Sequence, residues 1–137
     1  MSNVATKAQR PRKVLVADDD AFMQRIAAGL LHRAGHACDT VGDGSEAMHY
    51  LALNEVDLLL LDVSMPVLDG LATLARLRGL ERHAAAVRRH RIIMVTAHAE
   101  PGDFDRLRAA GADGCIAKPI DPTAFLREVA RVLALPA

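Results

Sequence analysis

Residues 57–62 read DLLLLD, and this short run decides the fold. Its leucines, Leu58 to Leu61, are apolar at every position, whereas a strand with one face in water alternates apolar and polar residues. Continuous apolar strands are typical of parallel sheets that carry helices on both faces. We therefore expect Leu58 to Leu61 to lie at the middle of such a sheet.

The rest of the chain repeats this pattern of a short aliphatic run followed by a longer stretch with helical period. Such alternation predicts an α/β fold, a doubly wound parallel sheet made of five strand–helix units. Gly35 and Gly111 follow two of the expected helices, and Asp121 precedes Pro122 as a helix cap. The expected strands are 14–17, 37–41, 57–61, 91–95 and 114–117, and the expected helices are 21–33, 45–53, 71–82, 101–110 and 122–134.

Composition restricts the classes of protein that remain. With 137 residues the chain is long enough for one ordinary domain, which we place at residues 13–135 behind a disordered leader or linker at 1–12. Seventeen basic residues balance seventeen acidic ones, so we expect no direct nucleic-acid partner. No apolar run approaches the length of about 20 residues that a bilayer span needs, and we expect no membrane insertion. The two cysteines have neither disulfide nor zinc spacing, which favours the cytoplasm.

Charged and hydroxyl side chains follow several of the expected strands, at the edge of the sheet where α/β proteins bind ligands. Asp18 and Asp19 follow the first strand, Asp62 the central one, Thr96 the fourth and Lys118 the fifth. Converging carboxylates repel each other unless a cation shares the site, and a hard ion with oxygen ligands, Mg²⁺, fits them best. Carboxylate, ammonium, hydroxyl and metal together match the needs of phosphoryl transfer. Asp62 is the best candidate nucleophile, because it ends the most buried strand and faces a loop, residues 63–70, that we expect to leave its carboxylate accessible.

Asp20 has a different expected role. It stands directly before the predicted helix at 21–33, where a carboxylate most often accepts a hydrogen bond from the first turn. We therefore interpret Asp20 as a helix cap and leave Asp18 and Asp19 for the metal.

Four segments, in this order and spacing, closely resemble the receiver domain of two-component response regulators: VLVADDD (14–20), LLLLDVSMPVLDG (58–70), IIMVTA (92–97) and GADGCIAKPI (111–120). The resemblance implies a flavodoxin-like, CheY-like fold with strand order 2-1-3-4-5. It implies that Asp62 is the phosphoacceptor and that Thr96 and Lys118 contact the phosphoryl group, with a cis bond before Pro119. It also implies that Asp18, Asp19, Asp62 and the backbone carbonyl of Ser64 hold Mg²⁺.

The same resemblance implies partners and a way of signalling. A phosphohistidine on a histidine kinase or a histidine phosphotransfer protein would donate to Asp62, and the surface of the fourth helix, fifth strand and fifth helix would repack. Such a domain accepts phosphate and loses it slowly, and is not a turnover enzyme. Most receivers carry Tyr or Phe where this chain has Cys115. This cysteine, together with the long arginine-rich stretch between Arg76 and Arg91, resembles receivers attached to hybrid histidine kinases.

Two other functions stay open at this point. A pseudo-receiver would bind partners without phosphate, although the complete set of matched site residues argues against it. A phosphatase of the haloacid dehalogenase type would carry its nucleophile on the first strand in a D-x-D-x-[TV] motif, whereas residues 18–22 read DDDAF.

One segment is dense in arginine, and we expect a solvated helix end and loop there, with a docking surface for an acidic partner as the alternative. It contains Arg76, Arg78, Arg82, Arg88, Arg89 and Arg91 against the single acid Glu81.

Overall fold

The computed structural model describes residues 11–83 and 88–136 of the chain, and strands and helices alternate along it. Residues 1–10, most of the predicted leader, lie outside the described residues. The elements are β1 (Lys13–Ala17), α1 (Ala21–Arg33), β2 (Ala37–Val41), α2 (Gly44–Leu53), β3 (Leu58–Asp62), α3 (Gly70–His83), β4 (Ile92–Thr96), α4 (Asp103–Ala109), β5 (Gly114–Ala117) and α5 (Pro122–Leu133).

The sheet is parallel and has the strand order β2-β1-β3-β4-β5. Its central strand is β3, in which Leu60 pairs with Val16 of β1 on one side and with Ile93 of β4 on the other. Every residue of β3 is buried, as the continuous run of leucines predicts. The predicted α/β class, the doubly wound sheet and its strand order are confirmed.

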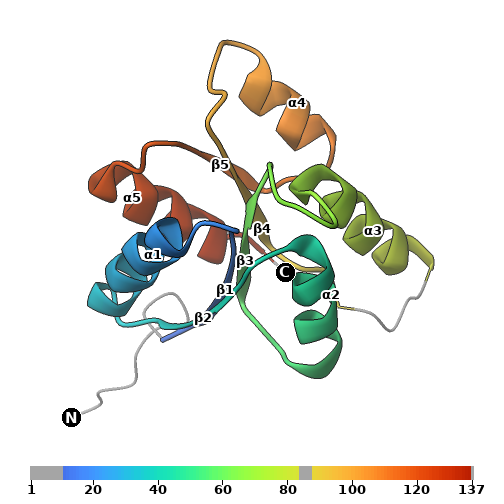
Figure 1. Cartoon of the computed structure of the whole chain (residues 1–137), viewed down its shortest axis with the longest axis horizontal. Helices are drawn as coiled ribbons and strands as arrows, with labels where there is room; N and C mark the ends of the chain where they lie inside the picture. The colour runs from blue at the N-terminus through green and yellow to red at the C-terminus, as the bar shows by residue number, and fades with distance from the viewer. Residues whose placement is uncertain (1–10, 84–87, 137) are drawn as a thin grey trace.

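Helices cover both faces of this sheet (Figure 1). Alternate residues of each strand point to opposite faces, so Leu58 and Leu60 pack in one core cluster with α1 and α5. Leu59 and Leu61 pack in a second cluster with α2, α3 and α4. The two clusters hold the strand ends in fixed positions, which is what a site at the edge of the sheet requires.

The observed boundaries differ from the predicted ones at a few places. Asp57 stands before β3 rather than in it, because its side chain accepts a hydrogen bond from the Lys13 N–H at 2.8 Å. The helix expected from residue 101 begins at Asp103, because Gly102 has a φ of 93° and interrupts the helical conformation. Every other boundary agrees to within one residue. Within the described residues, no helix is long and apolar enough to cross a membrane.

The arginine-rich segment is only partly the solvated surface that we expected. Arg78 of α3 is 8% exposed, and its guanidinium donates to Glu81, to Asp113 and to the carbonyl oxygens of His90 and Gly111. Its distances to the carboxylates are 2.9 Å for Glu81 and 3.0 Å for Asp113. The prediction was therefore wrong for Arg78, which joins α3 to the segments that lead into β4 and β5.

Replacing Arg78 tests this network. Arg78→Ala leaves Glu81 and Asp113 nearly buried without their shared cation, and we expect the free energy of unfolding to fall by about 3 kcal/mol. Arg76, exposed on the same helix, provides the matched control, because Arg76→Ala should change the free energy by no more than about 0.5 kcal/mol. Urea denaturation of both variants measures the difference, and equal losses would contradict this role for Arg78.

Glu81 gives the same network a pH dependence. Burial raises the pKa of Glu81, but the backbone N–H of His90 and the guanidinium of Arg78 outweigh burial and hold the pKa below its ordinary value of 4.5. A carboxyl group whose pKa is lower in the folded state stabilises the fold above its unfolded pKa, and this stabilisation is lost as pH falls through the folded pKa.

We therefore expect the free energy of unfolding to depend less on pH in Glu81→Gln than in the unmodified chain, in the range from about pH 5 down to about pH 3. Denaturant titrations across this range measure the slope. Glu55→Gln, at an exposed glutamate, is the control and should keep the slope of the unmodified chain. A Glu81→Gln slope as steep as that of the control would refute the assignment.

Candidate functional site

Three carboxylates meet at the carboxyl edge of the sheet. Asp18 and Asp19 follow β1, Asp62 is the last residue of β3, and these two strands are neighbours in the sheet. One carboxylate oxygen from each lies within 4.8 Å of the others. Asp18 and Asp62 are each only 4% exposed, whereas Asp19 faces solvent. The prediction of an accessible Asp62 carboxylate was therefore wrong, because Asp62 is the last residue of a fully buried strand. The structure thus brings together the three acids that the sequence predicted for a metal site.

Lys118 reaches this cluster from the segment that follows β5. Its Nζ lies 3.1 Å from Oδ2 of Asp18 and 3.2 Å from Oδ2 of Asp62. Its backbone N–H donates to the carbonyl oxygen of Thr96 at 2.8 Å, which fixes the start of this segment against the end of β4. The peptide bond from Lys118 to Pro119 is cis, as the resemblance implied.

The electrostatics of Asp62 and Lys118 reflect this crowding. Burial raises the pKa of Asp62, and the charge of Asp18 raises it further, more than the Lys118 ammonium and the Ser64 N–H lower it. Burial also lowers the pKa of Lys118, but its hydrogen bond to Asp18 and the charge of Asp62 outweigh this and keep the pKa above 10.5. One ammonium therefore compensates only part of the negative charge in the cluster.

Thr96 and Ser64 complete the predicted set. Thr96 ends β4, is 4% exposed, and its Oγ1 accepts a hydrogen bond from the backbone N–H of His98 at 3.0 Å. Ser64 lies two residues after Asp62, and its backbone N–H donates to Oδ1 of Asp62 at 3.3 Å. Thr96 therefore ends the strand next to β3, and Ser64 follows β3 itself.

Asp20 is a helix cap, as the sequence predicted. Its Oδ1 accepts a hydrogen bond from the backbone N–H of Phe22 at 2.9 Å, which satisfies one of the free donors in the first turn of α1. Its own backbone N–H donates to Oδ1 of Asp18 at 2.9 Å and so helps to orient that carboxylate.

Two further residues, which were not predicted from the sequence, shape the site. The side-chain amide of Gln24 donates to the carbonyl oxygens of Asp18 at 2.6 Å and Val41 at 3.2 Å, and so ties the end of β1 to the end of β2. A Cβ on Gly70 would lie 2.1 Å from the carbonyl oxygen of Asp62, so only glycine fits there. Gly70 could have been suspected from the DG pair that ends the 58–70 segment, whereas Gln24 carries no such signal.

The donor set fits a hard divalent cation. All of its groups are oxygens, and two of them come from buried carboxylates. Three carboxylates face the single ammonium of Lys118, so the cluster carries more negative charge than Lys118 neutralises. Mg²⁺ prefers oxygen ligands from one or two carboxylates and keeps several waters, which the exposed position of Asp19 allows.

Comparison with known proteins identifies the class. The profile of the Response regulator receiver domain family matches residues 14–130, and the chain belongs to this family. Receiver domains are signalling modules, in general not turnover enzymes, and they bind Mg²⁺ at an acidic cluster of the kind formed here by Asp18, Asp19 and Asp62.

Individual relatives agree with this family assignment. The chain is 35% identical over 107 residues to the sensor histidine kinase RcsC of Escherichia coli, covering 78% of this chain and 11% of that protein. It is 33% identical over 117 residues to hybrid signal transduction histidine kinase I of Dictyostelium discoideum, covering 82% of this chain and 7% of that protein. The chain thus spans only a small part of these relatives.

A solved structure has the same fold. Chemotaxis response regulator CheY4 of Vibrio cholerae superposes with a TM-score of 0.78 at 28% sequence identity, covering 90% of this chain and 99% of CheY4. This agreement extends over nearly the whole described fold.

Stability measurements with magnesium test the acidic cluster. A ligand that binds only the folded state stabilises it by about 2.7 kcal/mol at roughly a hundred times its Kd, so Mg²⁺ should raise the midpoint of thermal unfolding. Asp18→Asn removes one carboxylate and should lose most of this increase. Asp20→Asn should keep it, because asparagine caps a helix as well as aspartate does. An unchanged magnesium effect in Asp18→Asn would rule out the cluster as the metal site.

Proposed function

We propose that this chain is a phosphorelay receiver that accepts a phosphoryl group from phosphohistidine onto Asp62. The observation that carries the proposal is the position of the Asp62 carboxylate. It is buried at the end of the central strand, 3.2 Å from the Lys118 ammonium and grouped with Asp18 and Asp19. A carboxylate so placed can act as a nucleophile toward a group whose negative oxygens need positive charge around them.

In the proposed step an Asp62 carboxylate oxygen attacks phosphorus, the P–N bond to the donor imidazole breaks, and its electron pair returns to the nitrogen. The product is an aspartyl phosphate, which water later hydrolyses to free phosphate and the original carboxylate. No oxidant or further co-reactant is needed. Phosphoryl transfer of this kind depends mainly on positioning and on charge stabilisation.

Each site residue has a task in this step. Lys118 neutralises a phosphoryl oxygen, and the Thr96 hydroxyl donates a hydrogen bond to another. Gln24 and Gly70 hold the backbones of Asp18 and Asp62 in place. The ligands proposed for Mg²⁺ are Asp18, Asp19, Asp62 and the backbone carbonyl of Ser64. When bound, the metal supplies charge that offsets the oxygens of the transferred group.

The partners follow from the proposed chemistry. The relatives named above are histidine kinases, which supports a histidine kinase, a histidine phosphotransfer protein, or both, as donor or acceptor of the phosphoryl group. The proposal includes no direct contact with nucleic acid and no catalytic turnover of small substrates. We also propose a cytoplasmic location. Both cysteines are free thiols, which is typical of proteins in a reducing compartment.

The proposed signal is a change in the surface formed by α4, β5 and α5. Once Thr96 turns toward the phosphoryl group, the segment between β4 and α4 must follow, because the backbone N–H of His98 is bonded to Thr96 Oγ1. The small side chain of Cys115 is buried beneath this surface. A partner would recognise the rearranged surface.

Labelling by acetyl phosphate tests the function. With Mg²⁺, intact-mass spectrometry should show one added phosphoryl group on the unmodified chain, and none on Asp62→Asn, which keeps the shape but not the nucleophile. Asp69→Asn is the matched control in the segment after Asp62, because asparagine can still accept the hydrogen bond from the Ala72 N–H. Adducts should be absent without metal.

The opposite result has a clear meaning. A folded chain that takes no phosphoryl group from acetyl phosphate or from phosphorylated kinases would be a pseudo-receiver, which binds its partners unmodified. Labelling that persists in Asp62→Asn would place the nucleophile elsewhere.

A further inference from the structure

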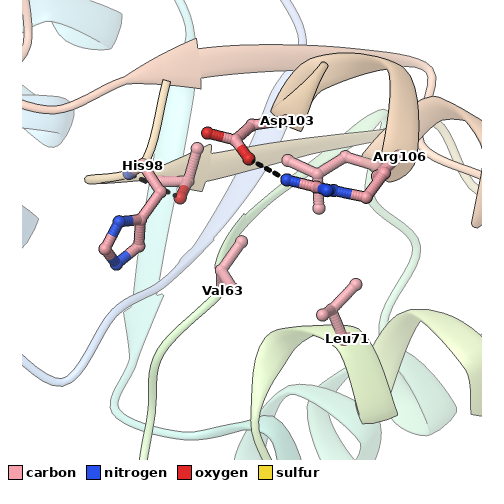
Figure 2. A pocket seen from close by; sticks show the side chains of 7 residues that line it. Val63, Leu71, His98, Asp103 and Arg106 are labelled. Atoms are coloured by element: carbon pink, nitrogen blue, oxygen red, sulfur yellow. Dashed lines mark hydrogen bonds and ion pairs between the residues drawn. The ribbon is translucent and has the colours of Figure 1, made fainter. Parts of the chain in front are cut away.

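A pocket of about 360 Å³ lies between α3 and α4 (Figure 2). Val63 and Leu71 form one side of it, and Leu107 of α4 and Thr96 of β4 contribute to its lining. In Figure 2 the ion pair of Asp103 and Arg106 lies opposite Val63 and Leu71. Pockets of this size that are mostly apolar, with a few polar groups, are typical sites for small molecules.

The apolar lining is available to a ligand. Leu71 is 43% exposed, and Val63 is half-buried. A flat ring placed between Leu71, Val63 and Leu107 would remove this apolar surface from water, which is the main favourable term in such binding.

The polar side of the pocket favours an anion. Asp103 is already occupied, because one carboxylate oxygen accepts from Arg106 and the other from the backbone N–H of Glu100 at 2.7 Å. Arg106 uses Nη2 for that contact, and its side chain is 78% exposed, so further N–H groups of the guanidinium can reach a ligand. His98 stands at the other end of the pocket and can donate from its imidazole.

From this arrangement we infer that the pocket binds a small aromatic carboxylate. The ring lies between Val63, Leu71 and Leu107, and the carboxylate accepts hydrogen bonds from the guanidinium of Arg106. Guanidinium and carboxylate form strong charge-assisted hydrogen bonds, which gives the site its preference over neutral rings.

Such a ligand is linked to phosphorylation, and this part of the inference rests on the proposed function. The ligand packs against Thr96 as it stands in the unphosphorylated chain, and a phosphoryl group on Asp62 would draw Thr96 out of that contact. A ligand that prefers one of two states shifts the equilibrium toward it, and the effect is reciprocal. Binding of the aromatic carboxylate therefore opposes phosphorylation of Asp62.

Binding is tested first, with 1-naphthoate as the probe and the unphosphorylated chain as the target. Amide resonances of Thr96, His98 and Leu107 should shift saturably in NMR titrations. Leu71→Gln and Arg106→Gln should each weaken binding roughly tenfold, since each removes one of the two main contacts. The neutral isostere 1-naphthamide should bind more weakly than the carboxylate.

Matched controls lie on the same two helices. Leu80→Gln replaces an exposed leucine of α3 outside the pocket, and Arg108→Gln replaces a neighbouring arginine of α4, so both should bind 1-naphthoate as the unmodified chain does. Absence of saturable shifts, or equal weakening in the control variants, would overturn the proposed site.

The linkage is tested by the rate at which acetyl phosphate labels the chain. Saturating 1-naphthoate should slow labelling of the unmodified chain and leave the rate of Arg106→Gln nearly unchanged. An unaffected rate in a chain that binds the probe would overturn the linkage. Failure of labelling without any probe would overturn the proposed function instead, and the binding titration would still decide the fate of the pocket.

Discussion

The ammonium of Lys118 lies between two carboxylates that the fold has removed from water, and the rest of the site depends on this contact. Asp18 and Asp62 end neighbouring strands, so the parallel sheet itself forces their charges together. A buried carboxylate without compensation costs several kcal/mol, and Lys118 offsets only part of that cost, as the raised pKa of Asp62 indicates. The remaining negative charge is what makes this edge of the sheet a place for a metal ion. The two apolar clusters on the faces of the sheet stabilise the fold although its carboxyl edge carries uncompensated negative charge.

At the opposite end of the sheet, the buried charges are compensated by other groups of the protein. There Arg78 meets Glu81 and Asp113, and backbone carbonyl and N–H groups occupy the positions that the side chains leave. Arg89 also pairs with Asp113 at 2.6 Å, so two guanidiniums balance the two carboxylates. The cluster therefore needs no added ion and serves to join α3 to β4 and β5. This difference distinguishes a functional cluster from a structural one. Both ends of the sheet bury ionisable groups, but of these two clusters the one at the carboxyl edge leaves part of its charge without a protein partner. Burial alone would not have told them apart.

The same contrast explains what the sequence could predict. The run Leu58 to Leu61 indicated the central strand because burial on both faces leaves no polar position, and acids placed directly after strands could be brought to one edge by the parallel topology alone. Arg78 could not be separated from its exposed neighbours, because its partner Asp113 is distant in sequence and their contact exists only after the sheet has formed. The start of α4 was misplaced because Pro101 is compatible with a first helical turn, whereas the left-handed conformation of Gly102 depends on the path of the chain.

The same α4 determines how this receiver could respond. It has seven residues, only Leu107 is buried, and no side chain caps its first turn. One pocket lies on its α3 side, and a second, of about 210 Å³, is lined by Phe104, Cys115 and Phe125 toward α5. Because little apolar contact holds α4 and space exists on both sides, moving it breaks few favourable interactions. Cys115 touches the carbonyl oxygen of Phe104 at 3.9 Å and is too small to fill the second pocket. On the proposed function, displacement of α4 as a unit would therefore replace the ring movement for which most receivers carry an aromatic residue.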